Sequence, residues 1–334
     1  MWNWIASRPR YCLKIGLRDL AWAEVSRDWR GRPRYRCAVS PLPDGVLRLS
    51  PLEQNILQPN EMETHIRALT GTTPAVPSGA ESVSRPVPRA ATVVLPDLAV
   101  RLAVLTLQDL PWSSEERDAV VRWRLGQEQL LSLAGAKVFS QVMSDPASSG
   151  EGPYTIFAVI VQEAVLAQYE SVCEAAGLIP QEVDVASLRL LNLWARGLEG
   201  LQRLTSDYLW LNATDGGFTA FVFHRGNLVY VRSKLQSGAA QAPSLVQDRT
   251  GVDRIVQECA DSIYACQQHT DGLDISQVVL LADETLSPDL QKRFEKGLGV
   301  NVSLIDWDHL KRQGRGAVLG SHAIAALPAV AGVM

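Results

Sequence analysis

The sequence predicts an α/β protein made of two similar lobes, and two observations support this. Each half of the chain opens with three short apolar runs separated by tight turns, at residues 12–17, 20–27 and 34–43 and again within 208–233. In both halves these runs are followed by further segments of alternating helical and β periodicity. A chain of 334 residues, 46% of them hydrophobic, can bury a core of this size.

The segments between and after the two strand units complete the expected order. A helix is predicted at 60–69 with Asn60 as its N-cap, and a loop rich in Gly, Pro and Ser follows it. Strands are expected within 91–107, with a break near Pro96, and at 137–143 and 154–161, with a helix at 111–131 among them. The remaining predicted elements are a helix at 163–176, a strand leading into a helix at 180–198, a helix at 251–269, a strand at 276–282, a helix at 287–299, a strand at 300–306 and an apolar helix at 316–334 that breaks at Pro328.

Composition excludes several classes of protein. The net charge of −4 and a pI near 5.8 argue against a nucleic-acid-binding protein, which usually carries a basic surface. No apolar run has the length of a transmembrane helix. Five scattered cysteines without a CxxC pair favour structural thiols in a reducing compartment, and the five histidines lack metal-ligand spacing. No metal site is therefore predicted.

The N-terminus "MWNWIASRPR" lacks the apolar region and cleavage site of a signal peptide, so we expect a cytoplasmic protein. Trp2 and Trp4, followed by Arg8 and Arg10, have the chemistry of a segment that touches a membrane surface. The alternative interpretation is a tail packed onto its own domain.

Two halves that each begin with a strand–turn–strand–turn–strand unit indicate the actin-like fold, which is also that of Hsp70 and the sugar kinases. In this fold a nucleotide lies between the lobes, and each lobe offers one turn to its phosphates. The predicted first lobe comprises residues 1–90 and 178–205, and residues 206–320 form the second lobe. Residues 91–177 form an inserted α/β subdomain, and the C-terminal helix 316–334 returns to the first lobe.

Several segments resemble the PilM family of actin-like type IV pilus assembly proteins. They are "VSPLPDGVL", "LTLQDLPWSSEERDAVVRWRLGQEQLL", "AVLAQYESVCEAAGLIPQEVDVASLRLLNL" and "VVLLADETLSPDLQKRFEKGLGVNVSLID", and their order and spacing cover nearly the whole chain. The resemblance implies that the insert corresponds to the extra subdomain of FtsA-like actin relatives.

The resemblance also places three nucleotide loops on this sequence, and each departs from the ATP-binding pattern. In the first, Lys14 precedes Gly16 and Asp19 and stands where the family has a metal-binding aspartate, although a charged lysine has no lone pair to offer. In the second, Asn212 replaces a carboxylate, Thr214 replaces a glycine, and Asp215 would repel an arriving phosphate. Gly216 and Gly217 follow. They either bind a nucleotide in a variant mode or only allow the geometry of the hairpin. In the third, Ala282, Asp283 and Glu284 replace a run of glycines and add negative charge.

The resemblance therefore implies a pseudo-ATPase without cofactor, which acts as a scaffold at the inner face of the inner membrane. Its expected partner is the cytoplasmic tail of a PilN-like bitopic membrane protein, which docks in a groove beside the insert. Contacts with pilus motor ATPases and a ring or homo-oligomer are further expectations. Trp112 and Trp123 of the insert are interpreted either as core or as a partner surface. The alternatives are an ATPase or small-molecule kinase that binds ATP with Mg²⁺, and the cytoplasmic domain of a GspL-like type II secretion protein.

Overall fold

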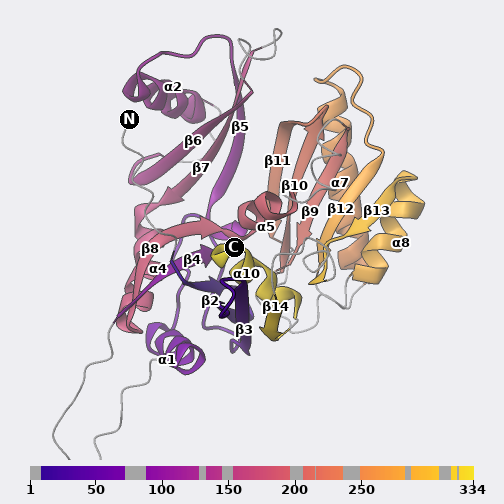
Figure 1. Cartoon of the computed structure of the whole chain (residues 1–334). Helices are drawn as coiled ribbons and strands as arrows, with labels where there is room; N and C mark the ends of the chain where they lie inside the picture. The colour runs from indigo at the N-terminus through magenta and orange to yellow at the C-terminus, as the bar shows by residue number, and fades with distance from the viewer. Residues whose placement is uncertain are drawn as a thin grey trace, which may run out of the picture.

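The structure is a computed structural model, and it describes residues 9–71, 88–127, 133–144, 153–195, 206–214, 216–235, 249–282, 287–307, 317–321 and 323–334. Two large sheets face each other across a layer that contains α5 and α10, and a third, smaller sheet stands above the first (Figure 1). The predicted two-lobed, actin-like α/β fold is confirmed.

The first lobe is built on a six-stranded mixed sheet with the order β14-β3-β2-β1-β4-β8. The hairpin strands β1, β2 and β3 pair antiparallel, whereas β4 and β8 run parallel to β1. Side chains alternate along β1, so that Leu13 and Ile15 pack toward α1 and α4 while Cys12 packs toward α5 and α10. The elements are β1 (Tyr11–Ile15), β2 (Asp19–Arg27), β3 (Pro33–Pro41), α1 (Pro59–Thr70), β4 (Arg89–Leu95), α4 (Glu163–Ala175), β8 (Leu178–Val185), α5 (Ala186–Ala195), β14 (Ala317–Gly320) and α10 (Leu327–Val333).

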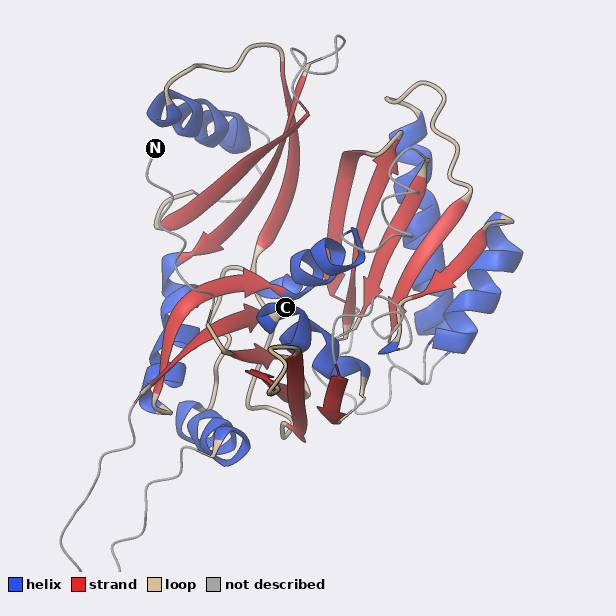
Figure 2. Ribbon diagram, viewed as in Figure 1, coloured by secondary structure: helices blue, strands red, loops and turns tan. Residues whose placement is uncertain are grey.

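The second lobe repeats this plan with a five-stranded sheet in the order β11-β10-β9-β12-β13. Leu209 and Leu211 of β9 pack toward α7 and α8 on the outer face, and the alternate residues Tyr208 and Trp210 face the first lobe. Figure 2 shows both outer helices on the side of this sheet that is turned away from the first lobe. The elements are β9 (Tyr208–Ala213), β10 (Gly217–His224), β11 (Asn227–Leu235), α7 (Arg249–Gln267), β12 (Gln277–Ala282), α8 (Ser287–Leu298) and β13 (Asn301–Leu304).

One hydrophobic cluster joins the two lobes. Tyr208 and Trp210 of the second sheet pack with α5, α10 and the inner face of the first sheet. The Trp194 and Tyr208 rings lie 5.2 Å apart, and Tyr208 stacks on Phe223 at 4.5 Å. Aromatic pairs at these distances add to the stabilisation from buried area, so the lobes share a core.

The insert is shorter than the predicted 91–177. It is a three-stranded sheet in the order β5-β7-β6 with the helix α2 packed on it, and β5 also packs against β11 of the second lobe. The strand β4 and the helix α4 belong instead to the first lobe, because Tyr169 and Val172 are buried in that lobe's outer core. The insert's elements are β5 (Arg101–Leu107), α2 (Ser114–Gln127), β6 (Ala136–Ser144) and β7 (Tyr154–Gln162), and the short 3-10 helix η1 (Asp97–Ala99) leads into it.

Two elements begin where the sequence prediction did not place them. The predicted helix 316–334 is wrong: residues 317–320 form β14 beside β3, a 3-10 turn η3 (Ile324–Ala326) follows, and α10 starts at Leu327. Pro328 lies in the first turn of α10 and starts the helix, because proline lacks only an N–H that has no partner there. Likewise α1 begins at Pro59, with Gln58 rather than Asn60 as its N-cap residue.

Gly332 allows α10 to approach the first sheet closely. A Cβ atom at this position would overlap Sγ of Cys12 in β1. Among the helices in the described ranges, none is long and apolar enough to span a bilayer.

Candidate functional site

The first predicted phosphate turn is closed by its own side chains. Lys14 is only 2% exposed in β1, and its Nζ donates to Oδ1 of Asp19 at 2.8 Å. The N–H of Gly16 donates to the carbonyl of Asp19, also at 2.8 Å. The ammonium group is therefore paired with the carboxylate across the β1–β2 turn. This turn carries a buried cation where a metal site would need an acidic ligand.

The second predicted turn is anchored by a buried polar network. The side-chain amide of Asn212, at the end of β9, donates to Oγ of Ser187 at 2.8 Å and to Oδ2 of Asp97 at 3.2 Å. Asp97 accepts the backbone N–H of Ser187 at 2.8 Å and also accepts the Ser187 hydroxyl. Thr214 donates to Oδ1 of Asn212 at 2.9 Å. We call the first three residues the Asp97–Ser187–Asn212 network.

This network satisfies the N-terminus of α5 with a negative charge from the protein itself. The exposures of Asp97, Ser187 and Asn212 are 8%, 0% and 3%, so little water reaches them. A helix N-terminus attracts anions through its exposed N–H groups and its dipole, and phosphates bind there in many proteins. Here the anion at that position is the Asp97 carboxylate.

The glycine that follows the second turn is required by packing. A Cβ atom on Gly217 would lie 2.6 Å from Cδ1 of Leu98 and 2.6 Å from the carbonyl oxygen of Lys234. Leu98 belongs to η1, which connects the first lobe to the insert. The small residue thus lets η1 approach the β10–β11 hairpin. Gly216, with φ of 73°, supplies the left-handed turn before it.

By strand alternation, Lys14 lies on the same face of its sheet as Cys12, and Asn212 lies on the same face as Trp210. Both leading residues of the two predicted phosphate turns are therefore directed toward the layer between the lobes. Ala282 ends β12 beside Ala213 and is buried. Asp215, Asp283 and Glu284 lie outside the described residues.

An ionic cluster on β8 holds α5 in place. Nη2 of Arg189 lies 2.9 Å from Oε2 of Glu182, and its Nε pairs with Asp184. Thr92 donates to the same Glu182 oxygen at 3.0 Å. Burial raises the pKa of Asp184 above its ordinary value, and the neighbouring Arg189 opposes this. Both carboxylates are engaged by the arginine, so the cluster's role is to hold α5 on β8.

The five cysteines lack the features of a reactive thiol. All five cysteines are buried and unpaired, and burial raises the pKa of Cys266 to about 11 and of Cys173 to about 12. Such thiols are almost entirely protonated at neutral pH and are poor nucleophiles. Within the described ranges, no group of three His, Cys, Asp or Glu residues could hold a metal ion.

Sequence reasoning missed Asp97, Leu98 and Ser187. The sequence predicts a break near Pro96 and a strand leading into a helix within 180–198, but Asp97 and Ser187 lie 90 residues apart. Residues this far apart in the chain that meet in a buried hydrogen-bond network leave no local sequence pattern. The only available signal was an aspartate directly after a buried strand and a serine in the first turn of a helix.

A groove of about 440 Å³ lies between α1 and α4. Four small residues of α4, at helical spacing, line one wall together with Gln168 and Val172, and the other side is formed by α1 and the preceding loop. Glu63 is the one charged residue among the groove's described lining positions. The lining residues are Gln54, Ile56, Pro59, Asn60, Glu63, Ala164, Ala167, Gln168, Ser171, Val172 and Ala175.

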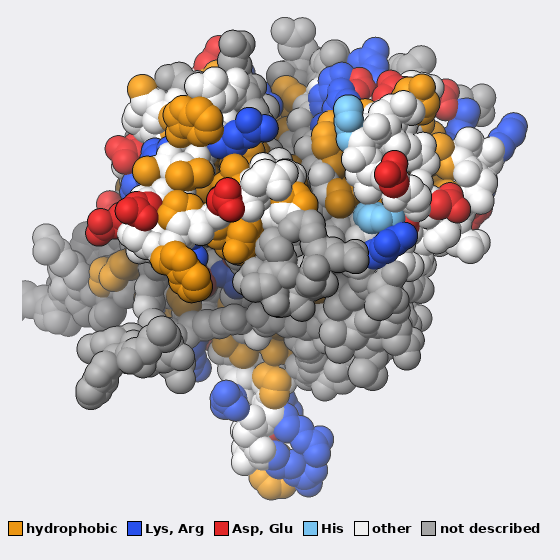
Figure 3. Space-filling model, turned by 90° about the horizontal axis from the view of Figure 1, so that it is seen from above, with side chains coloured by type: hydrophobic (Ala, Val, Ile, Leu, Met, Phe, Trp, Pro, Cys, Tyr) orange, Lys and Arg blue, Asp and Glu red, His pale blue; other side chains and the backbone are white. Residues whose placement is uncertain are grey.

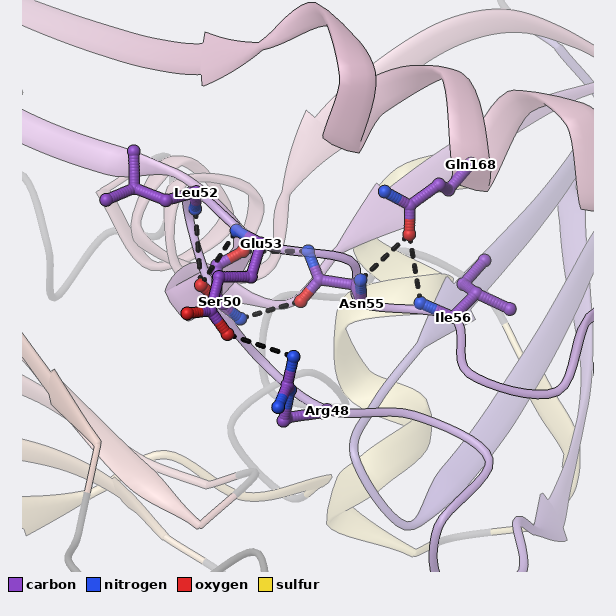
Figure 4. A network of polar contacts seen from close by, with 7 residues as sticks. All are labelled: Arg48, Ser50, Leu52, Glu53, Asn55, Ile56 and Gln168. Atoms are coloured by element: carbon purple, nitrogen blue, oxygen red, sulfur yellow. Dashed lines mark hydrogen bonds and ion pairs between the residues drawn. The ribbon is translucent and has the colours of Figure 1, made fainter. Parts of the chain in front are cut away.

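The loop before α1 is held against α4 by one glutamine (Figure 4). Oε1 of Gln168 accepts the backbone N–H groups of Asn55 at 2.8 Å and Ile56 at 3.1 Å. The fully buried Asn55 side chain in turn exchanges hydrogen bonds with the backbone of Ser50, at 2.6 and 2.7 Å. The groove wall is thus preformed, because its backbone donors are already satisfied.

Comparison with known structures supports the fold. The chain aligns over 98% of its length with the whole of a chain in the structure named "PilM-PilN type IV pilus biogenesis complex", at 20% identity and a TM-score of 0.72. It also aligns with the cytoplasmic domain of EpsL from the type II secretion system of Vibrio cholerae, covering 95% of this chain and 92% of that one, at 9% identity and a TM-score of 0.46. No family model and no curated protein matches the sequence. The chain therefore has the fold of that PilM-complex chain.

Replacing Asn212 with aspartate should destabilise the protein. The variant loses the amide donor to Asp97 and Ser187 and places a second carboxylate beside that of Asp97 in a buried site. We expect a loss of about 2–4 kcal/mol in the free energy of unfolding, measured by denaturant titration at pH 7. Asn227→Asp, at an exposed position of the same lobe, is the matched control and should stay within about 0.5 kcal/mol of the parent. Equal stability of the two variants would contradict the network.

Gly217→Ala tests the close contact between η1 and the hairpin. The added methyl group overlaps Leu98 and the Lys234 carbonyl, so we expect a destabilisation of about 1–3 kcal/mol in thermal unfolding. Gly126→Ala in α2 is the control, because nothing lies within 4 Å of its added Cβ. That variant should be stabilised by about 0.5–1 kcal/mol through helix propensity. A neutral Gly217→Ala variant would show that the glycine serves something other than packing.

Proposed function

We propose that the chain is a non-catalytic scaffold of a type IV pilus or related secretion machine and that its interlobe site binds no ATP. The Asp97–Ser187–Asn212 network carries this proposal. The N-terminus of α5 could receive an anion such as a phosphate, but the Asp97 carboxylate already occupies that position. The Lys14–Asp19 pair supports the proposal, because the β1–β2 turn has a paired lysine where a metal-binding carboxylate would be needed. In chemical terms the protein is a pseudo-ATPase without a bound cofactor.

The proposed partner is the cytoplasmic tail of a PilN-like membrane protein. The similar solved structure is of a complex named for PilM and PilN, and the sequence resembles the PilM family. We place the tail in the α1–α4 groove. Its small α4 residues leave room for the apolar side chains of such a tail. Glu63, the charged lining residue, already pairs with Arg67 at 2.7 Å, so apolar contact rather than charge carries this placement.

The insert supplies a second candidate contact surface, for another copy of the chain in a ring. Trp112 is fully exposed, and Trp123 and Phe139 are 62% and 59% exposed. Of the two interpretations of the tryptophans, core or partner surface, the core interpretation is therefore wrong. Val121 and Leu125 of α2 form the core there instead. Figure 3 looks down on the insert and shows hydrophobic side chains on this face. Bound to the tail of a membrane protein, the scaffold would sit at the inner face of the inner membrane, within reach of the motor ATPases.

The absence of ATP binding can be tested by calorimetry. Titration of the full chain with ATP and Mg²⁺ should give no heat of binding up to about 1 mM nucleotide, because Asp97 repels phosphate at the α5 N-terminus. A dissociation constant in the micromolar range would refute the pseudo-ATPase and favour the alternative of an active ATPase or kinase.

The groove can be tested by filling it. Ala167→Trp places an indole between α4 and α1, and we expect at least a tenfold loss of affinity for a labelled synthetic peptide of the PilN-like tail, measured by fluorescence anisotropy. Ala265→Trp is the matched control, because Ala265 is an exposed alanine on α7 of the other lobe. If the parent binds the peptide and Ala167→Trp binds it equally well, the tail docks elsewhere.

A further inference from the structure

The hairpin between β2 and β3 carries a charge opposite to that of the whole chain. Between Arg27 and Arg36 it contains five arginines and one aspartate, a formal charge of +4, whereas the chain has a net charge of −4. The other residues together therefore carry −8. The five are Arg27, Arg30, Arg32, Arg34 and Arg36, and all are exposed. We call this segment the arginine hairpin.

The acidic residue of the hairpin is used to build its turn. Oδ1 of Asp28 accepts the backbone N–H groups of Arg30 at 2.8 Å and Arg32 at 2.9 Å. The backbone of Asp28 closes the turn by donating to the Arg32 carbonyl and accepting from the N–H of Gly31. Gly31, with φ of 76°, takes the left-handed position. The turn is thus rigid and holds the arginine backbones in a defined arrangement.

No acidic side chain within the described ranges pairs with these arginines. Glu24 lies opposite Arg36 in the β2–β3 ladder but forms no ion pair with it. Among the described residues, the side chains of the five make a hydrogen bond from Arg27 to the Gly31 carbonyl and the stacking contact of Arg30 on Trp29. A concentrated positive charge is therefore presented to the surroundings.

Trp29 at the tip adds an apolar anchor. Its side chain is 83% exposed, and the guanidinium carbon of Arg30 lies 4.3 Å from its ring centroid. Trp29 belongs to none of the hydrophobic clusters that the described residues form, so the fold does not bury this ring. Tryptophan and arginine together are the residues that settle at the headgroup level of a bilayer, where the ring meets the acyl boundary and guanidinium groups bind phosphates.

The hairpin projects from the first lobe, so it can reach a flat surface. A projection covered with basic side chains leaves the body at the lower edge of Figure 3. The carbonyl of Arg10, also exposed, accepts the N–H of Val25 at 2.9 Å at the base of the hairpin, so the chain enters the first sheet beside it and adds one more cation.

We infer that the arginine hairpin binds directly to the surface of a bilayer containing anionic phospholipids. Negative headgroups attract arginines close to the surface, and the interaction decays over about 10 Å at 0.1 M salt, which suits a short projecting element. The contact needs neither nucleotide nor the tail partner. This lipid contact is thus independent of the proposed tail partner and adds a second interaction to the proposed function.

The test is co-flotation of the full chain with lipid vesicles, without any partner. We expect binding to vesicles of phosphatidylglycerol mixed with phosphatidylcholine, no binding to pure phosphatidylcholine, and release in high salt. The variant Arg30→Glu/Arg32→Glu/Arg34→Glu should bind at least about a hundredfold more weakly, from roughly fivefold per arginine. Trp29→Ala should bind more weakly than the parent at unchanged charge.

The control reverses three exposed basic residues on the second lobe, Arg254→Glu/Lys292→Glu/Lys296→Glu, and makes the same change in net charge. It should still bind the vesicles, and all variants should unfold at the parent's temperature because the changed side chains are exposed. Three outcomes would overturn the inference: equal loss in the control, equal binding of the parent to neutral vesicles, or tighter binding to a DNA duplex than to anionic vesicles at the same salt concentration.

Discussion

The arrangement of the lobes depends on one buried charge, the carboxylate of Asp97. It lies between β4 and the insert, and its donors come from the first turn of α5 and from the end of β9. An ionised carboxylate that is 8% exposed would cost several kcal/mol without these donors. The first lobe, the insert and the second lobe are therefore coupled at one point, and none of the three can shift there without breaking a charged hydrogen bond.

The same use of internal partners explains how the predicted phosphate turns keep their shape. A nucleotide site must keep polar groups available to a ligand that comes and goes, whereas here they are satisfied internally. Lys14 pairs within its own turn, Asn212 binds Ser187 and Asp97, and Leu98 occupies the space beside Gly217. Internal partners offset the desolvation penalty of burying these groups. The turn after β9 thus helps to join the second lobe to the first.

The sequence predicted the strand units and most helices because their patterns are local. The three-strand units have alternating apolar residues between glycine-bearing turns, and helix 163–176 ends at Gly177 with φ of 83°. The run at 317–320 was misassigned because a short apolar segment reads equally as helix or strand until its neighbour β3 is known. The boundary of the insert was predicted wrongly for a similar reason. The burial of α4 in the first lobe is a tertiary contact that the local sequence pattern does not show. The partners Asp97 and Ser187 were out of reach because only the folded chain brings them together.

The α1–α4 groove and the arginine hairpin both belong to the first lobe. The helix α1, which forms one wall of the groove, packs on the sheet whose strands β2 and β3 extend into the arginine hairpin. A tail that emerges from a bilayer and a hairpin that rests on the same bilayer would then be engaged by a single lobe. Each contact would raise the effective concentration for the other, so that two weak interactions hold the chain firmly. The second lobe, which is linked to this body through Asn212 and the shared aromatic core, would be presented away from the membrane contact.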